Sequence, residues 1–301
     1  MQCANRGGFV LKPSYLKPHL SYQDQYKLLI ARNLIVTNET FCIKKLRHIN
    51  YYRLSAYFLP FYEKNNSFKE GVNFEEILQL YYFDKEFRNL MFYAIEKIEV
   101  YMRTQVAHVI SQKRGAFGYR DEEIMHDTKK HQEIINTIKS ETKRSKEVFV
   151  KEYFGKYDEE FLPVWSMVEI ISFNTLSKIF SNLKESYRKE ILQEIDIKPF
   201  VFENWLHVLT YVRNISAHHS RLWNKMLAIE PKKPKNQKSF DTLNSKKIYF
   251  VIRMILFILE KIDEQEFNLR NEIIALLKKY PKVDLVAMGF PNEWKERELC
   301  R

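Results

Sequence analysis

The sequence predicts an all-α fold, and three observations carry this prediction. The 301 residues include only 7 glycines and 9 prolines, too few for the many tight turns of an all-β protein. Successive segments repeat apolar residues at the three- and four-residue spacing of an amphipathic helix. No segment alternates polar and apolar residues as a half-buried strand does.

The N-terminal elements follow from prolines and capping residues. Residues 1–20 contain two prolines and read as an extended segment. Helical periodicity begins at Ser21, whose side chain suits an N-cap. It resumes after Thr37 or Asn38, either of which could cap a second helix.

The middle of the chain combines a long helix with a charged stretch. A third helix should end near Pro60, because proline removes a helical hydrogen bond. The apolar stripe that follows predicts a helix from about Phe74 to Gln112, broken at most once. Residues 121–156 are charged and helix-prone, which predicts a solvated helix or a projecting arm.

The second half begins with a segment that is apolar on nearly every side. With Pro163 at its first position, residues 163–183 predict a central, buried helix. A further helical segment and a lysine-rich loop follow, and then two closing helices at about 245–262 and 264–280. We therefore expect one all-α domain over residues 21–285 and a C-terminal tail over residues 286–301.

The charge balance favours a polyanionic partner. The formal net charge is +11 and the isoelectric point is about 9.3. A surplus of this size favours polyanions and makes their binding sensitive to salt, although it does not determine the fold. A basic protein with no nucleic-acid partner is the alternative. The six lysines of the loop would suit such a role, although a lysine-rich loop is usually only solvated: 232, 233, 235, 238, 246 and 247.

The cysteines and the hydropathy of the sequence indicate the cellular compartment in which the protein is expected. Cys3, Cys42 and Cys300 are scattered and form neither a CxxC pair nor a metal-ligand spacing, which fits a reducing cytoplasm. The first ten residues lack the apolar core of a signal peptide. The most apolar run is interrupted by Arg253 and is too short to span a bilayer. We expect a soluble cytoplasmic protein without a cofactor or a bound metal.

The segment "RNISAHHSRLWN", residues 213–224, concentrates the chemistry-bearing side chains. If the helix continues through it, four polar residues fall within about 60° of one another, because each residue advances about 100°: Asn214, His218, Arg221 and Lys225. This strip would border the apolar positions Tyr211, Ile215, Leu222 and Met226. Such an edge predicts a site at a helix–helix or dimer seam.

A second copy of the pattern lies earlier in the chain. "YMRTQVAH", residues 101–108, matches "YVRNISAH", residues 211–218, at the tyrosine, arginine, alanine and histidine. Glu99 precedes Arg103 by four residues, which favours a helical ion pair and a structural role for Arg103 and His108. The alternative is that Arg103 and His108 support RNA binding as a second half-site. Arg213 has no carboxylate within reach on its own helix and must find an anion elsewhere.

The residue types of the second copy suit RNA cleavage. An imidazole, with an ordinary pKa of about 6.5, can exchange a proton with a ribose 2′-hydroxyl at neutral pH. A guanidinium offers a rigid pair of donors to a phosphate that gains charge in the transition state. Asn214 could orient the imidazole or add a neutral donor. These groups need no metal ion.

The motif "RNISAHHSRLWN" resembles the signature of the Abi-like (AbiD/AbiF) abortive-infection proteins, which are placed among the HEPN ribonucleases. Three further segments match in order: "INYYRLSAYFLPF" (49–61), "LYYFDKEFRNLMFYAIEKIEVYMRTQVAH" (80–108) and "LPVWSMVEIISFNTLSKIFSNL" (162–183). The resemblance covers roughly residues 18–260. It departs at Asn174, where the family pattern has glycine; asparagine tolerates positive φ, so we expect the turn to persist.

The resemblance implies a HEPN helical core, an active site completed by pairing two such units, and a role in phage defence or toxin–antitoxin biology. It also implies that Arg213 and His218 are the catalytic pair, with Asn214 beside the arginine and His219 as an ambiguous neighbour. The expected partners are an RNA substrate, a structured RNA inhibitor and a second copy of the chain in a homodimer.

Two alternatives remain open at this point. Glu169, a lone carboxylate in an apolar helix, could be a buried partner for Arg213 or a satisfied structural group. The whole protein could be a toxic metal-independent endoribonuclease, or a non-catalytic RNA-binding HEPN protein whose motif supports dimerisation. The intact Arg213, Asn214 and His218 favour the ribonuclease.

Overall fold

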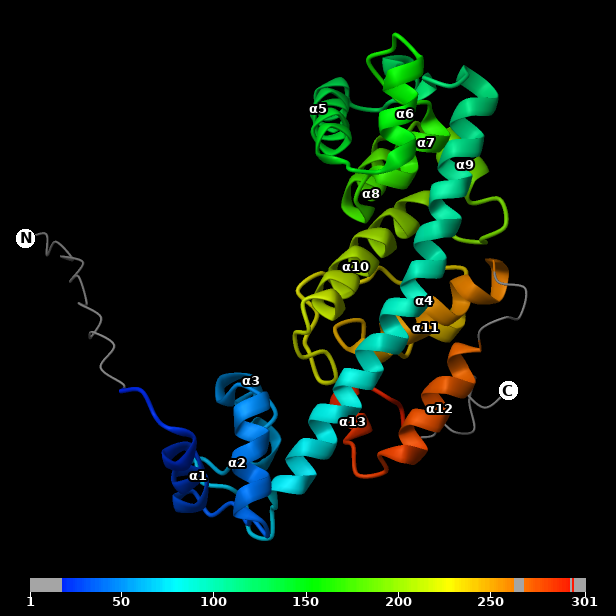
Figure 1. Cartoon of the computed structure of the whole chain (residues 1–301). Helices are drawn as coiled ribbons and strands as arrows, with labels where there is room; N and C mark the ends of the chain where they lie inside the picture. The colour runs from blue at the N-terminus through cyan, green and yellow to red at the C-terminus, as the bar shows by residue number, and fades with distance from the viewer. Residues whose placement is uncertain (1–17, 263–267, 293, 295–301) are drawn as a thin grey trace, which may run out of the picture. The chain divides into compact units, whose positions relative to one another are not determined.

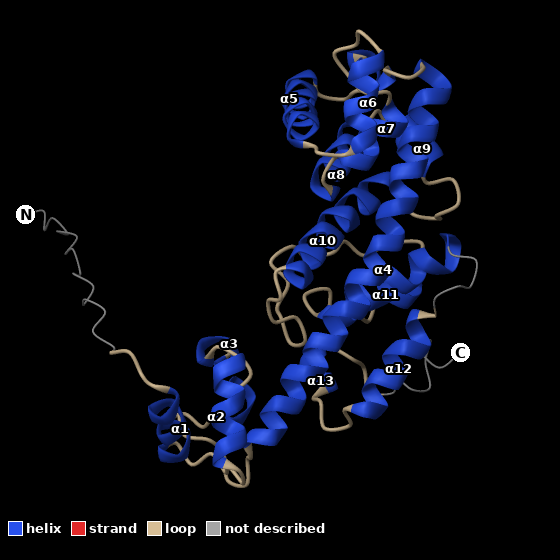
Figure 2. Cartoon of the chain, in the orientation of Figure 1, coloured by secondary structure: helices blue, strands red, loops and turns tan. Residues whose placement is uncertain are grey.

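The computed structural model describes residues 18–262, 268–292 and 294. Within these residues the chain forms thirteen α-helices and no strand beyond isolated bridges, so the all-α prediction is confirmed (Figure 2). Residue contacts divide the chain into two units, one up to Tyr81 and one from Tyr82 onward. One domain over residues 21–285, as expected from the sequence, stays a prediction. Most of the extended segment expected at residues 1–20, together with Cys3 and Cys300, lies outside the described residues.

The first unit contains three short helices and the start of a long one. They are α1 (Tyr22–Ala31), α2 (Glu39–His48) and α3 (Tyr51–Ser55). The Ser21 hydroxyl accepts the Asp24 N–H at the start of α1, and Asn38 caps α2, as the capping pattern predicts. Pro60 lies in a 3₁₀ turn after α3 rather than at the end of a continuous helix.

Helix α4 (Phe74–Arg114) runs unbroken for 41 residues, which confirms the long helix expected there. One of its faces is apolar and fully buried, with Ile77, Phe87, Met91, Ile98 and Met102 at helical spacing. Two charged residues, Asp84 and Arg88, interrupt this face and are buried with it.

The charged stretch at residues 121–156 is not a projecting arm, contrary to that part of the expectation. It forms α5 (Thr128–Arg144) and α6 (Val148–Lys156). Helix α5 packs on α7 (Val164–Ile170) and α8 (Phe173–Asn182), and it buries three isoleucines and His131. Most of its charged residues lie on the solvent face, so α5 is an amphipathic helix despite its highly charged composition.

The apolar segment 163–183 forms two helices rather than one. Helix α7 ends at Ile170, and Ser172 caps α8 by accepting the Thr175 N–H. Asn174 lies inside α8 and does not adopt positive φ, so the expectation of a glycine-type turn there is wrong. Glu169 is exposed on α7, and the expectation of a buried carboxylate is also wrong.

The rest of the second unit surrounds α10 (Pro199–Ala217), which packs on α8, α9 (Glu185–Ile191) and α11 (Ile248–Ile262) (Figure 1). After α12 (Leu269–Lys279), the expected tail includes part of α13 (Leu285–Met288), and its Phe290 and Trp294 are buried. Among the described residues, no helix combines the length and apolar character needed to cross a membrane.

Candidate functional site

Helix α10 ends inside the motif. Its last helical residue is Ala217, and His218 is the C-cap, so Arg213 and His218 stand on either side of the helix end. The Ser220 N–H donates to the Ile215 carbonyl at 3.0 Å, and the His219 N–H donates to the Ser216 carbonyl at 3.1 Å. These two bonds form the Schellman ending of a helix.

His219 occupies the position at which this ending usually has glycine. Its φ is +56°, in the left-handed region that costs free energy for residues with a side chain. Histidine is among the residues that tolerate this conformation best. A left-handed residue next to a candidate catalytic group suggests that the site requires the backbone to turn here.

The polar strip expected from the sequence does not form, because α10 ends at Ala217. Asn214 lies on α10 and His218 caps it, but Arg221 and Lys225 belong to the loop after the helix. The apolar positions separate in the same way, since Leu222 is buried and Met226 is exposed. The four polar residues therefore do not share one helical face.

A buried carboxylate of α4 holds this loop in place. Asp84, which is fully buried, accepts the backbone N–H of Trp223 at 2.8 Å and that of Leu222 at 3.2 Å. Its carboxylate also pairs with Arg88, one turn further along α4. Backbone donors and an arginine together satisfy the carboxylate, which makes its burial tolerable. Asp84 thus fixes the course of the chain directly after the motif.

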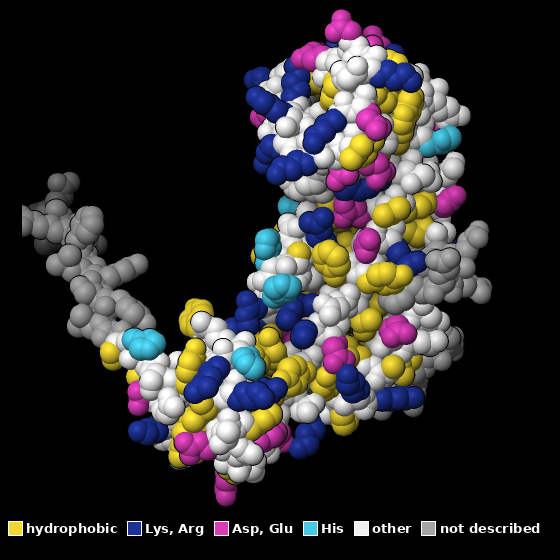
Figure 3. Space-filling model, in the orientation of Figure 1, with side chains coloured by type: hydrophobic (Ala, Val, Ile, Leu, Met, Phe, Trp, Pro, Cys, Tyr) yellow, Lys and Arg dark blue, Asp and Glu magenta, His cyan; other side chains and the backbone are white. Residues whose placement is uncertain are grey.

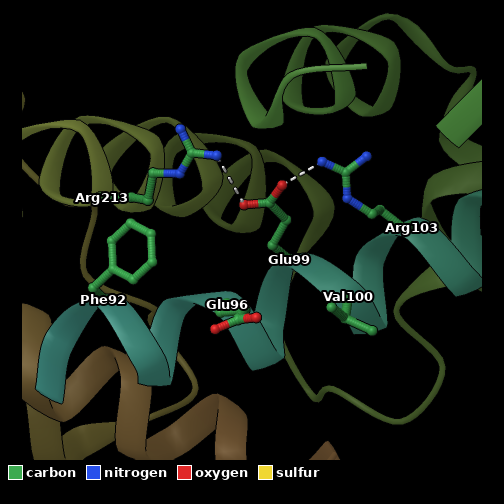
Figure 4. Close-up of a pocket in the computed structure, with 6 residues that line it drawn as sticks. All are labelled: Phe92, Glu96, Glu99, Val100, Arg103 and Arg213. Atoms are coloured by element: carbon green, nitrogen blue, oxygen red, sulfur yellow. Dashed lines mark hydrogen bonds and ion pairs between the residues drawn. The ribbon is translucent and has the colours of Figure 1, made fainter. Parts of the chain in front are cut away.

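A second carboxylate of α4 joins the two similar motifs. Glu99 pairs with Arg103 on its own helix, and its other oxygen lies 3.6 Å from Nη2 of Arg213 (Figure 4). The expected Glu99–Arg103 pair is confirmed. The anion that Arg213 requires is therefore Glu99 on α4, and Glu169 does not fill that role.

Arg103 and Arg213 differ in their remaining contacts. Arg103 also donates to the backbone carbonyls of Val168 and Ile171, the latter at 2.9 Å, and so closes the C-terminal end of α7. Arg213 donates to the Asn214 side-chain oxygen at 3.3 Å, and its own side chain is 32% exposed. The first arginine is committed to structure, whereas the second keeps donors that face solvent.

A small pocket adjoins Arg213. It has a volume of about 240 Å³ and is lined by six residues of α4 and α10: Phe92, Glu96, Glu99, Val100, Arg103 and Arg213. The Phe92 ring lies beside the Arg213 side chain in Figure 4. The pocket therefore presents two guanidinium groups, of which that of Arg213 is the more exposed, beside an apolar ring and carboxylates.

The histidines of the two motifs are also placed differently. His108 lies on an exposed position of α4, within the helix, while His218 is exposed at the end of α10. Within the described residues, no group of three or more histidine, cysteine, aspartate or glutamate side chains is arranged to hold a metal ion.

Sequence reasoning missed the role of Asp84 and the second partner of Glu99. A signal for Asp84 was present, because an aspartate and an arginine four residues apart interrupt the apolar stripe of the long helix. The Glu99–Arg213 contact joins residues 114 positions apart on two helices. No local spacing encodes such a contact.

Comparison of the sequence with models of protein families identifies the family of this chain. The model of the Abi-like protein family matches residues 44–224, more than half of the sequence. The chain belongs to the Abi-like protein family. The match includes Asp84, Glu99 and the Arg213–His218 segment, and it ends at Asn224 directly after the Asp84-bound loop. No match to a curated protein or to a solved structure was found.

Proposed function

We propose that this Abi-like protein is a metal-independent endoribonuclease of the HEPN type, acting in phage defence or as the toxin of a toxin–antitoxin system. Family membership points to abortive infection. The observation that carries the proposal is the state of Arg213, which Glu99 orients without covering its exposed donors. His218 stands exposed five residues further on, at the end of the same helix.

The proposed reaction begins with proton transfer at the ribose. The imidazole of His218 accepts the proton of the 2′-hydroxyl, and the 2′-oxygen attacks the adjacent phosphorus. The bond from phosphorus to the 5′-oxygen then breaks, and that oxygen takes up a proton. The products are a 2′,3′-cyclic phosphate and a 5′-hydroxyl. Arg213 stabilises the charge that develops on the phosphoryl oxygens, and Asn214 holds the arginine through its side-chain oxygen.

The need for a second proton carrier favours a homodimer. One Arg213–His218 motif supplies one imidazole, whereas the reaction benefits from both a base and an acid. A two-fold axis would bring a second imidazole, His218 of the partner subunit, to the same phosphate. A phosphate between two basic motifs offsets their repulsion, so RNA should tighten the dimer.

The toxic activity would have to be held silent by an inhibitor. A net charge of +11 suits a structured RNA inhibitor as well as an RNA substrate, because both are recognised through phosphates. His219, Arg221 and Lys225 follow Arg213 in the chain and are the supporting residues for either RNA.

A non-catalytic RNA-binding protein is the second candidate, and one observation favours it. Glu99 already offsets part of the positive charge of Arg213, which weakens its pull on a phosphate. In that case the motif would hold RNA or a second subunit without cleaving.

Subunit mixing tests the proposal and separates the candidates. Wild-type protein should cleave RNA in EDTA, and Arg213→Ala and His218→Ala should not. Each inactive variant, added to wild type, should lower the activity per wild-type subunit if the site is shared. RNA binding without cleavage by the wild type would favour the second candidate.

A further inference from the structure

A second pocket lies on α10, at the opposite end of the helix from the motif. It has a volume of about 360 Å³, within the range of small-molecule sites. Residues of α8, α10 and the loop after the motif line it: Asn174, Ser177, Lys178, Ser181, Phe200, Glu203, Asn204, His207 and Lys232. We propose that this pocket holds a nucleotide of the same single-stranded RNA that extends to His218 at the end of α10. This inference rests on the proposed function.

The loop wall of the pocket is fixed on α10 by three hydrogen bonds. The Asn204 side-chain oxygen accepts the Lys232 N–H at 2.6 Å, and its amide donates to the Glu230 carbonyl at 3.1 Å. The indole N–H of Trp205 donates to the Lys232 carbonyl at 2.9 Å. These bonds set the backbone of Lys232, so its position does not depend on a mobile loop.

The fixed lysine stands over an exposed aromatic ring. Its ammonium lies 5.3 Å from the centroid of the Phe200 ring, and the Phe200 side chain is 49% exposed on α10. Proteins that bind single-stranded nucleic acids combine exposed aromatic rings, on which bases stack, with nearby cations that meet the backbone phosphates.

The charges around the pocket favour a phosphate. Lys178 of α8 adds a second ammonium to that of Lys232. Glu203 is the one acidic residue of the lining, and its carboxylate lies 2.9 Å from Nη1 of Arg188. Because Arg188 offsets this carboxylate, the two lysines leave the lining positive.

The pocket shares a face of α10 with Asn214 and with His218 at the helix end, whereas Arg213 lies about 120° around the helix from His207. Phe200, His207 and Asn214 follow one another at intervals of seven residues, close to two helical turns. With a rise of about 1.5 Å per residue, His207 lies roughly 10 Å from Asn214 along the axis. Figure 3 shows histidine side chains along α10 and lysine and arginine side chains gathered over α5. A few nucleotides of extended strand would span this distance.

The test measures binding without cleavage. A 2′-O-methyl RNA decamer lacks the attacking hydroxyl, so fluorescence anisotropy with the full chain reports affinity alone. Phe200→Ala and Lys232→Ala should each weaken decamer binding about tenfold, and Lys232→Ala should lower the salt slope by about one. A dinucleotide, which reaches only the motif, should bind each variant as it binds the wild type.

Matched variants control for folding and for charge. Phe200→Trp keeps a stacking surface and should restore binding. Phe149→Ala and Lys146→Ala remove an exposed ring and an exposed lysine outside the pocket, and they should bind as the wild type does. Unfolding curves that match the wild type exclude a structural cause.

The outcomes separate this inference from the proposed function. If Phe200→Ala and Lys232→Ala bind the decamer as tightly as the wild type and still cleave RNA, the pocket does not bind RNA. The proposed nuclease activity would be unaffected. If the wild-type protein cleaves no RNA but the two variants still lose decamer binding, the pocket is supported and the proposed nuclease activity is contradicted. If Phe200→Ala weakens the binding of AMP but leaves the affinity for the decamer unchanged, the pocket binds a free nucleotide. That result would contradict the proposal that pocket and motif bind one RNA strand.

Discussion

Glu99 lies between Arg103 and Arg213, 3.6 Å from Nη2 of the latter, and so ties together the arginines of two similar motifs. The contact places a carboxylate of α4 where it sets the direction of the Arg213 guanidinium (Figure 4). The separation exceeds that of a strong charge-assisted hydrogen bond. A phosphate can therefore engage the exposed donors while Glu99 holds the side chain.

Replacement of Glu99 should impair cleavage more than it impairs folding. Glu99→Ala removes the acceptor that orients Arg213, and we expect kcat/KM to fall by about ten- to a hundredfold, the scale of a misplaced catalytic group. Glu99→Gln retains an oxygen acceptor and should preserve more activity. Steady-state kinetics beside thermal unfolding checks this prediction, and equal activity in all three proteins would contradict it.

The two adjacent histidines can be separated by a glycine. His219→Gly suits the left-handed backbone and removes the imidazole, so stability should change by less than about 1 kcal/mol. We expect it to retain cleavage with weaker RNA binding, whereas His218→Ala should be inactive and folded. Valine at position 219 should destabilise the helix end. An inactive, folded His219→Gly would instead assign the proton transfer to His219.

Removal of the Asp84 carboxylate should loosen the loop after the motif. Because breaking a buried ion pair by removing one partner costs about 3–5 kcal/mol, Asp84→Ala should lower the free energy of unfolding on that scale. Hydrogen exchange should accelerate at the Leu222 and Trp223 amides, which donate to this carboxylate. Unchanged urea unfolding and exchange would show that the loop is held by other contacts.

The earlier motif should behave as scaffold. Arg103→Ala removes the Glu99 pair and the bonds to two α7 carbonyls, so we expect a loss of about 1–3 kcal/mol in unfolding free energy. His108→Ala changes an exposed residue and should stay within about 0.5 kcal/mol of the wild type, with full toxicity in cells. Loss of toxicity in a stable His108→Ala would make this motif a second half-site.

The sequence predicted the elements whose signals are local. Ser21 and Asn38 cap the helices as expected, and the apolar stripe after Phe74 gave the long helix nearly to its end. The end of α10 was missed because no glycine marks it, and His219 takes the left-handed conformation instead. Extending that helix past Ala217 produced the incorrect strip with Arg221 and Lys225.

The candidate site could be predicted only in part for a related reason. Residue types at short spacing identified Arg213, Asn214 and His218 as candidates, and the pairing of Glu99 with Arg103 followed from four-residue spacing. Which carboxylate meets Arg213 depends on how α4 packs near α10. Glu169, one of the alternatives left open by the sequence, does not fill this role because its side chain lies exposed on α7.

The most direct test of the central claim is the chemistry of the cut. RNA would be incubated with the protein in EDTA, the cleaved position mapped, and that one nucleotide replaced by its 2′-deoxy form. We predict that wild-type protein leaves a 2′,3′-cyclic phosphate and a 5′-hydroxyl, that the 2′-deoxy substitution abolishes this cut, and that His218→Ala does not cleave. Cleavage that requires added Mg²⁺, survives the 2′-deoxy substitution or persists in His218→Ala would contradict the proposed mechanism.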